Sequence, residues 1–439
     1  MRISGRCGCV VMLVCALTLS LPAQENDNLV ARGRNDENTV TTAHYSIHAA
    51  APRDAAARGD AETSQEADAA DEREPLRAVA REVGHRLEAY LDLYNRQFRF
   101  PLEELDERLT VRLFDVRDEY DAYLSDRIGE APGDVVYLHY PDPGQRELVG
   151  YIGEDFPTEA LIHHSFVQFL RAFIPDPPLW IREGFAVYFS QTRYDEGFRQ
   201  AVYRENLTWL ATLKEMQAGA SSRPWIPWDD LLTMAPSDVQ EHAESFYPQA
   251  WGLVSFLMHD DHREINRLAW DSITALDREY SLQENNQAVY RNAFRWEDPE
   301  QLERRFQEYV TSRRTFAEWV STGVERYEQA DLSGAERAMV EALRLRRDHH
   351  VPFYYLGLIN YDREAYTTAA HYFQDALQHS ESSAHILYAL GVNAIADDRP
   401  EDAREFLESI PRERTELTTR AGELLRRLPG SGGAGSGGR

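Results

Sequence analysis

Apolar and polar residues alternate along four short stretches in the first part of the chain. A period of two is typical of β-strands that bury one face. Between these stretches, residues 76–98 place apolar side chains at helical spacing, and residues 117–128 are predicted to form a shorter helix. The pattern therefore predicts an α+β fold in which a small sheet precedes a long helical region. The predicted strands are residues 39–49, 109–116, 133–140 and 147–153, of which the last two are expected to pair across a turn at residues 141–145.

Residues 158–173 are predicted to form a buried helix. Thr158 is placed to cap its N-terminus, and Glu159 lies in the first turn, where a negative charge is favourable. One face of the helix is apolar with a period of 3.6 residues and should therefore be buried. That face consists of Ile162, Phe166, Phe169 and Phe173. The prolines of residues 175–178 end this helix, a second helix is expected over residues 179–192, and the chain stays largely helical to about residue 316, including residues 246–259.

The C-terminal part of the chain repeats itself with a period of 34 residues. Glycine recurs where two helices would pack closely, and alanine recurs where the second helix would cross the first, which is typical of tetratricopeptide repeats. Residues 317–427 are therefore predicted to form three such repeats, with an irregular helical bundle as the alternative. The recurring sets are Gly323, Gly357 and Gly391; Ala335, Ala369 and Ala403; Ala342, Ala376 and Ile410; and Trp319, Phe353 and Leu387.

The first 23 residues have the pattern of a secretory signal peptide. Arginines precede an apolar run, and Ala23 offers a small residue for cleavage. A membrane anchor is the alternative, although the run is short for a bilayer, and lipidation at Cys15 is a further one. The other cysteines, Cys7 and Cys9, lie in the same segment, so the mature chain has no thiol for disulfides, metal binding or catalysis.

Charge and composition limit the partners and mark the polar segments. The 439 residues carry a formal net charge of -27, which disfavours a nucleic-acid partner because phosphate binding needs a basic surface. Residues 24–75 are expected to be a polar, acidic linker or insertion around the strand at 39–49. Residues 428–439 are expected to be a flexible Gly/Ser tail, and no segment after the signal peptide resembles a transmembrane helix.

Two segments carry the pattern of a zinc peptidase. In the gluzincin pattern H-E-x-x-H, two histidines four residues apart on one helix face the same metal, and the glutamate is the general base for the metal-bound water. A later W-x-x-E-G-x-A-x-Y supplies a glutamate as third ligand. The second segment is complete here, with Trp180, Glu183, Gly184, Ala186 and Tyr188.

The first segment is incomplete. His163 stands at the first ligand position, His164 where the base glutamate belongs, and Val167 where the second histidine belongs. The chain resembles the peptidase MA-like gluzincin domains of exported proteins, which often carry tetratricopeptide repeats behind them. The resemblance covers about residues 39–316, with residues 76–316 as the domain itself, and includes the strand and helix near 109–124 and the helix near 246–257.

The resemblance implies that His163 and Glu183 are residual metal ligands and that Tyr247 lies near the substrate. Val167 has no lone pair, and adjacent helical residues point about 100° apart, so His163 and His164 cannot replace an i,i+4 pair. Two of the usual three ligands remain, unless Asp176 or a nearby histidine completes the site. A neutral imidazole at His164 would accept protons near pH 7, but only beside a positioned metal-bound water.

The leading hypothesis is therefore an exported pseudo-metallopeptidase, periplasmic, envelope-associated or secreted, with no cofactor. Its tetratricopeptide repeats would hold a peptide or protein. On this hypothesis Glu183 pairs with Arg182 or His163, and Tyr247 is a packing residue. One alternative is an active zinc-dependent metallopeptidase of the gluzincin type with unusual ligands, and a second is a structural envelope assembly protein.

Two other pairs of histidines were considered as sites. His259 and His262 have an i,i+3 spacing that suits a metal, although an exposed helix end is the simpler interpretation. His349 and His350 are expected to lie in a solvated loop between repeats.

Overall fold

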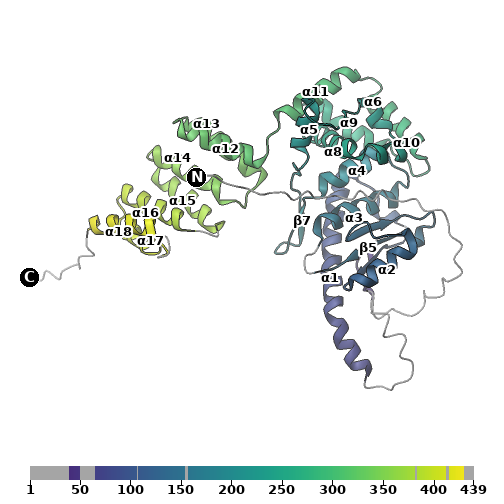
Figure 1. The fold of residues 1–439 in the computed structure, drawn as a ribbon, viewed down its shortest axis with the longest axis horizontal. Coiled ribbons are helices and arrows are strands. Elements are labelled where there is room, and N and C mark those ends of the chain that lie inside the picture. The colour runs from purple at the N-terminus through teal and green to yellow at the C-terminus, as the bar shows by residue number, and fades with distance from the viewer. Residues whose placement is uncertain are drawn as a thin grey trace, which may run out of the picture. The chain divides into compact units, whose positions relative to one another are not determined.

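The computed structural model describes residues 39–49, 65–105, 107–153, 157–380, 383–411 and 415–429. The chain separates into two compact units that divide between Ser312 and Arg313 (Figure 1). The predicted signal peptide, its three cysteines and most of the Gly/Ser tail lie outside the described residues. Within the described ranges, no helix has both the length and the apolar character needed to cross a membrane.

The first unit contains a five-stranded mixed sheet with the strand order β1-β2-β3-β5-β4. β2, β3 and β5 run parallel to one another, whereas the outer pairs β1–β2 and β4–β5 are antiparallel. The predicted pairing of residues 133–140 with 147–153 is confirmed, with Val135 opposite Gly150. The strands are β1 (Thr39–Thr41), β2 (Tyr45–Ala49), β3 (Leu109–Phe114), β4 (Val135–Leu138) and β5 (Glu147–Tyr151).

Two predictions for the start of this unit are corrected. Residues 39–49 form a two-stranded hairpin rather than one strand, because the chain turns where the N–H of Thr42 donates to the carbonyl of Tyr45 at 3.0 Å. The acidic segment interpreted as linker up to residue 75 is helical from its later part onward: α1 spans Gln65–Phe98. Acidic residues near a helix N-terminus are favoured by the helix dipole, so a charge-rich segment can extend a helix.

The two faces of the sheet are covered by different helices. Side chains alternate between the faces along each strand. Tyr137 and Leu148 point toward the core that includes α1 and α3 (Thr158–Phe173), whereas Val136, Leu138 and Val149 pack with α2 (Arg117–Ile128). Figure 1 shows α3 and α2 on opposite sides of β5.

The rest of the first unit is helical apart from one hairpin, as its sequence pattern predicts. α3 begins at Thr158, but Pro157 takes the cap position that was assigned to Thr158, and α4 ends at Phe189 rather than residue 192. The elements are α4 (Leu179–Phe189), β6 (Arg193–Asp195), β7 (Gln200–Val202), α5 (Leu210–Gln217), α6 (Trp228–Thr233), α7 (Pro236–Glu241), α8 (Ala243–His259), α9 (Arg263–Thr274), α10 (Leu282–Val289), the π-helix η6 (Tyr290–Phe294) and α11 (Pro299–Ser312), with the short 3-10 turns η4 (Leu102–Glu104) and η5 (Pro143–Gln145).

The second unit is a stack of helix pairs. Where Gly323 and Gly391 lie, an added Cβ would come within 2.6 Å of Met339 and Leu407 respectively, so each glycine permits close packing inside its own pair. Ala335, Ala369 and Ala403 are fully buried, as their spacing predicts. The helices are α12 (Phe316–Glu328), α13 (Leu332–Leu345), α14 (His350–Asp362), α15 (Tyr366–Gln378), α16 (Ala384–Ala396), α17 (Pro400–Glu408) and α18 (Thr415–Arg427).

The two histidines between the first repeats are not in a solvated loop. His349 is the N-cap of α14, where its Nδ1 accepts a hydrogen bond from the N–H of Val351 at 3.3 Å, and His350 is the first helical residue. The two imidazole rings stack with centroids 5.0 Å apart, and the ring of Phe316 lies 4.8 Å from that of His349. These histidines therefore have a structural role in joining one repeat to the next.

Candidate functional site

The residues that match the zinc-peptidase pattern lie on α3 and α4, which are packed together and joined by residues 174–178. Every residue of α4 is buried, so its polar side chains are held inside the unit rather than on its surface. Nε2 of His163 on α3 lies 3.4 Å from Oε2 of Glu183 on α4. The structure therefore brings together the two positions at which the resemblance places residual metal ligands.

Glu183 already has a cationic partner. Its Oε1 accepts a hydrogen bond from Nε of Arg182 at 2.6 Å, while Oε2 faces His163. Burial would raise the pKa of the Glu183 carboxyl, but the positive charge of Arg182 and the contact with His163 outweigh it and lower that pKa to about 2. Glu183 is thus ionised at neutral pH, and a guanidinium supplies part of the positive charge that a metal would supply.

His164 is poorly suited to the role of a base. Its ring lies beside that of His163, with centroids 5.0 Å apart, and its Nδ1 is buried without a hydrogen-bond partner. Burial, reinforced by the nearby imidazole of His163, lowers the pKa of His164 to about 3. A base with so low a pKa holds a proton weakly, so proton abstraction near neutral pH is inefficient.

The position of the missing second ligand belongs to the hydrophobic core. Val167 is 1% exposed and packs in the large apolar cluster of the first unit. Asp176, which was considered as a replacement ligand, faces Arg171 instead, with 3.5 Å between Oδ1 and Nη2. Across the part of the chain that the structure describes, no group of three or more His, Cys, Asp or Glu side chains could hold a metal ion.

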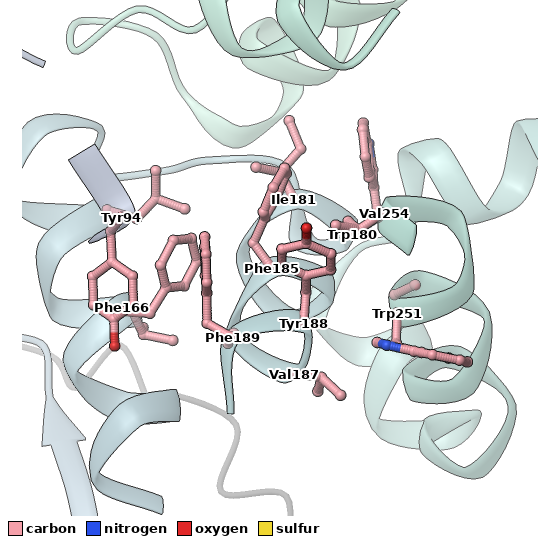
Figure 2. Packing of buried hydrophobic residues seen from close by; sticks show 14 of the residues in the cluster. Tyr94, Phe166, Trp180, Ile181, Phe185, Val187, Tyr188, Phe189, Trp251 and Val254 are labelled. Atoms are coloured by element: carbon pink, nitrogen blue, oxygen red, sulfur yellow. The ribbon is translucent and has the colours of Figure 1, made fainter. Parts of the chain in front are cut away.

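The remaining residues of the second segment pack α4 against α8. A Cβ on Gly184 would lie 2.5 Å from the carbonyl oxygen of Ala250, so only glycine allows the two helices to approach this closely. Ala186 and Trp180 are buried in the same cluster, and the Tyr188 hydroxyl lies 3.0 Å from Nε2 of His259. Figure 2 shows α4 side chains between Phe166 on one side and Trp251 and Val254 on the other. These four motif residues are accounted for by packing.

The helix that follows the motif contributes packing as well. Tyr247 on α8 is 3% exposed, with its ring against Phe246. Gln249 holds both backbone groups of Ile226, accepting from its N–H at 2.8 Å and donating to its carbonyl at 2.9 Å.

The histidine pair at the end of α8 does not form a joint site. Nε2 of His259 lies near the hydroxyls of Tyr188 and Tyr203, at 3.0 and 3.2 Å. His262 is exposed instead and pairs with Asp260 at 2.8 Å.

Several buried polar residues near Glu183 were missed from the sequence. Arg171 near the end of α3 is 2% exposed, and His139, directly after β4, is 6% exposed. Tyr137 lies on β4 with its hydroxyl 3.3 Å from Nδ1 of His139. The available signal was an arginine in the otherwise apolar segment "FVQFLRAF", since an arginine amid core residues marks a buried charge.

Comparison with known proteins is informative for the second unit. A tetratricopeptide repeat family model matches residues 361–428. That segment is a tetratricopeptide repeat. The match supports the repeats predicted from the 34-residue period and supports protein binding by them. No curated protein matches the chain.

Proposed function

We propose that this chain is an exported, non-catalytic relative of the gluzincin metallopeptidases that binds a peptide or protein through its tetratricopeptide repeats. The observation that carries the proposal is the state of Glu183. Both of its carboxylate oxygens face a nitrogen of the protein itself, Arg182 at 2.6 Å and His163 at 3.4 Å. A metal at this position would have to displace an ion pair that is buried and charge-balanced.

Loss of the general base supports the same conclusion. Hydrolysis by a zinc peptidase needs a group that accepts a proton from the metal-bound water. His164 occupies that position with a pKa of about 3, and the ring is neutral but weakly basic. Even a metal held by His163 and Glu183 would therefore lack an efficient proton acceptor.

The repeats supply the surface for a partner. The first helices of the three pairs carry Val320, Tyr354 and Tyr388 at equivalent positions 34 residues apart, and all three side chains are partly exposed. Large, partly exposed aromatic side chains are typical anchors in protein interfaces, since they bury much area at low entropic cost. A protein partner is therefore proposed to bind along α12, α14 and α16.

The proposal is tested by metal analysis of the purified full chain. Wild-type protein and the Glu183→Ala variant are dialysed against buffer and analysed for zinc per chain. We expect no stoichiometric zinc in either. One zinc per wild-type chain that is lost in the variant would contradict the proposal and favour the alternative of an active zinc peptidase, for which the 3.4 Å approach of His163 and Glu183 is the supporting observation.

A further inference from the structure

A buried polar cluster lies beside Glu183 and is built from three elements. β4 and the residue after it provide Tyr137 and His139, the last turn of α3 provides Arg171, and the first turns of α4 provide Arg182. These side chains are at most 6% exposed. The guanidinium groups of Arg171 and Arg182 lie close enough for each to affect the other's environment: burial and then the charge of Arg182 lower the pKa of Arg171 to about 9.

Arg182 has donors to spare. Its Nε is used by Glu183, but among the described residues no hydrogen bond of its terminal Nη1 and Nη2 groups is present. The side chain is nevertheless only 7% exposed. Arginine side chains buried to this degree usually place all their N–H groups on acceptors, because an unsatisfied charged donor is costly. The Nη groups thus form one half of an incomplete hydrogen-bonding arrangement.

His139 offers a second open position. Burial, followed by the positive charges of Arg171, Arg146 and Arg182, lowers the pKa of His139 to about 2, so its ring is neutral. With the Tyr137 hydroxyl donating to Nδ1 at 3.3 Å, the ring proton lies on Nε2. In this tautomer His139 presents an N–H donor in a region that already repels cations.

We propose that Arg182, Arg171 and His139 form a binding site for a carboxylate group. The two Nη groups of an arginine match the two oxygens of a carboxylate in a planar, bidentate arrangement. A monoanion is favoured over a phosphate dianion because the carboxylate of Glu183, 2.6 Å from Nε of Arg182, already places one negative charge at the site. The ligand is either a small carboxylic acid or the free C-terminus of a peptide.

This inference does not depend on partner binding by the repeats. It concerns only residues of the first unit, and the substitutions that test it leave the repeats unchanged. Loss of repeat binding in Tyr354→Ala/Tyr388→Ala with carboxylate binding intact would separate the two proposals, and so would the converse.

The experiment measures binding to the full chain by calorimetry and thermal unfolding at constant ionic strength. The probes are sodium benzoate against benzamide, and N-acetyl-Ala-Phe as the free acid against its C-terminal amide. Variants are Arg171→Gln, which leaves the Arg182–Glu183 pair in place, and Arg182→Gln/Glu183→Gln, which removes that pair together and leaves no isolated charge. The control is Arg112→Gln, whose guanidinium pairs with Glu147 on the opposite face of the sheet at 3.0 Å.

We expect at least one acid to bind more tightly than its amide and to raise the unfolding temperature. Binding should weaken at least tenfold in Arg171→Gln and in the double variant and stay unchanged in Arg112→Gln. Benzoate binding without peptide binding would identify a small acid as the ligand, and tighter binding of the peptide acid would identify a peptide C-terminus. Equal behaviour of each acid and its amide, or undiminished acid binding in both test variants, would overturn the proposal.

Discussion

Restoring the missing groups should restore a zinc site if the first unit has the inherited fold of a gluzincin. The relevant substitutions are Val167→His and His164→Glu. Residue 167 is one helical turn after His163, where side chains four apart lie on the same face with Cβ atoms about 6 Å apart. Glu183 is already 3.4 Å from the His163 ring, so the three ligands would converge from α3 and α4.

The magnitude follows from the burial of Val167. This side chain is 1% exposed in the apolar core, and an imidazole there is larger than valine and carries two polar nitrogens. Overpacking costs about 1–3 kcal/mol, and an unsatisfied buried polar group costs a further ~1–3 kcal/mol. Zinc at a hundredfold excess over its dissociation constant should return about 2.7 kcal/mol, because it binds the folded state only. The variant should therefore be clearly less stable than wild type without zinc and recover much of the loss with zinc.

The assay combines zinc per chain after dialysis with unfolding curves in chelator and in excess zinc. His164→Glu alone is the matched control, because it restores the base position without the second ligand and should take up no zinc. Protein that folds as the double variant, as judged by circular dichroism, yet binds no zinc and shows no zinc-dependent stabilisation would refute the reasoning. The arrangement of α3 and α4 would then not be that of a gluzincin site.

Three further outcomes are expected. The folded pKa of Glu183 lies below the ordinary carboxyl value of 4.5, so its stabilising effect is present above pH 4.5 and is lost as pH falls toward 2; wild type should lose roughly 1 kcal/mol per pH unit relative to Glu183→Gln in chemical unfolding between pH 4.5 and 3. The folded pKa of His164 is also lowered, from 6.5, so the unfolded chain takes up this proton first, and His164→Gln should lose less stability than wild type as pH falls from 6.5 to 4. Gly357→Ala should destabilise the repeats by about 1–3 kcal/mol in urea unfolding, since the new Cβ would overlap the Phe373 ring, whereas Gly422→Ala, with nothing within 4 Å, should be neutral or stabilising by up to ~1 kcal/mol.

The repeats were the most predictable part of the chain because their signal recurs. Each glycine and each alanine column is constrained by the same local packing, and three agreeing copies leave little freedom. The buried alanines and the close approach of Gly323 to Met339 follow directly from that period. Only the junction at His349 was misjudged, because a polar pair between helices looks the same in sequence whether it caps a helix or lies in solvent.

The start of the first unit was harder to predict. Residues 65–75 contain many acids, and acidic composition favours both solvated linkers and helix N-termini. Composition cannot decide between them, since the difference depends on whether the following helix continues backward. The alternation over residues 39–49 likewise does not reveal the turn after Thr41, because turn residues interrupt a strand without changing the period much.

The candidate site could be predicted only as far as the motif extends. The motif gave His163 and Glu183, which the structure brings together, and the neighbouring arginine at 182 was recognised as a possible partner of Glu183. Arg171 and His139 were not found, because they come from the end of a helix and the end of a strand. Only the tertiary packing of α3 beside β4 places them in one cluster, and no local pattern encodes that arrangement.

The glycine contacts in the second unit also bear on how such a chain can change length. Gly323, Gly357 and Gly391 each face a large side chain on the helix that follows, so every pair is assembled by one interchangeable rule. A segment of 34 residues copied in register would meet neighbours shaped to receive it on both sides. Duplication or deletion of whole repeats is thus a mechanically simple route to a longer or shorter docking surface, and it leaves the core of the first unit untouched.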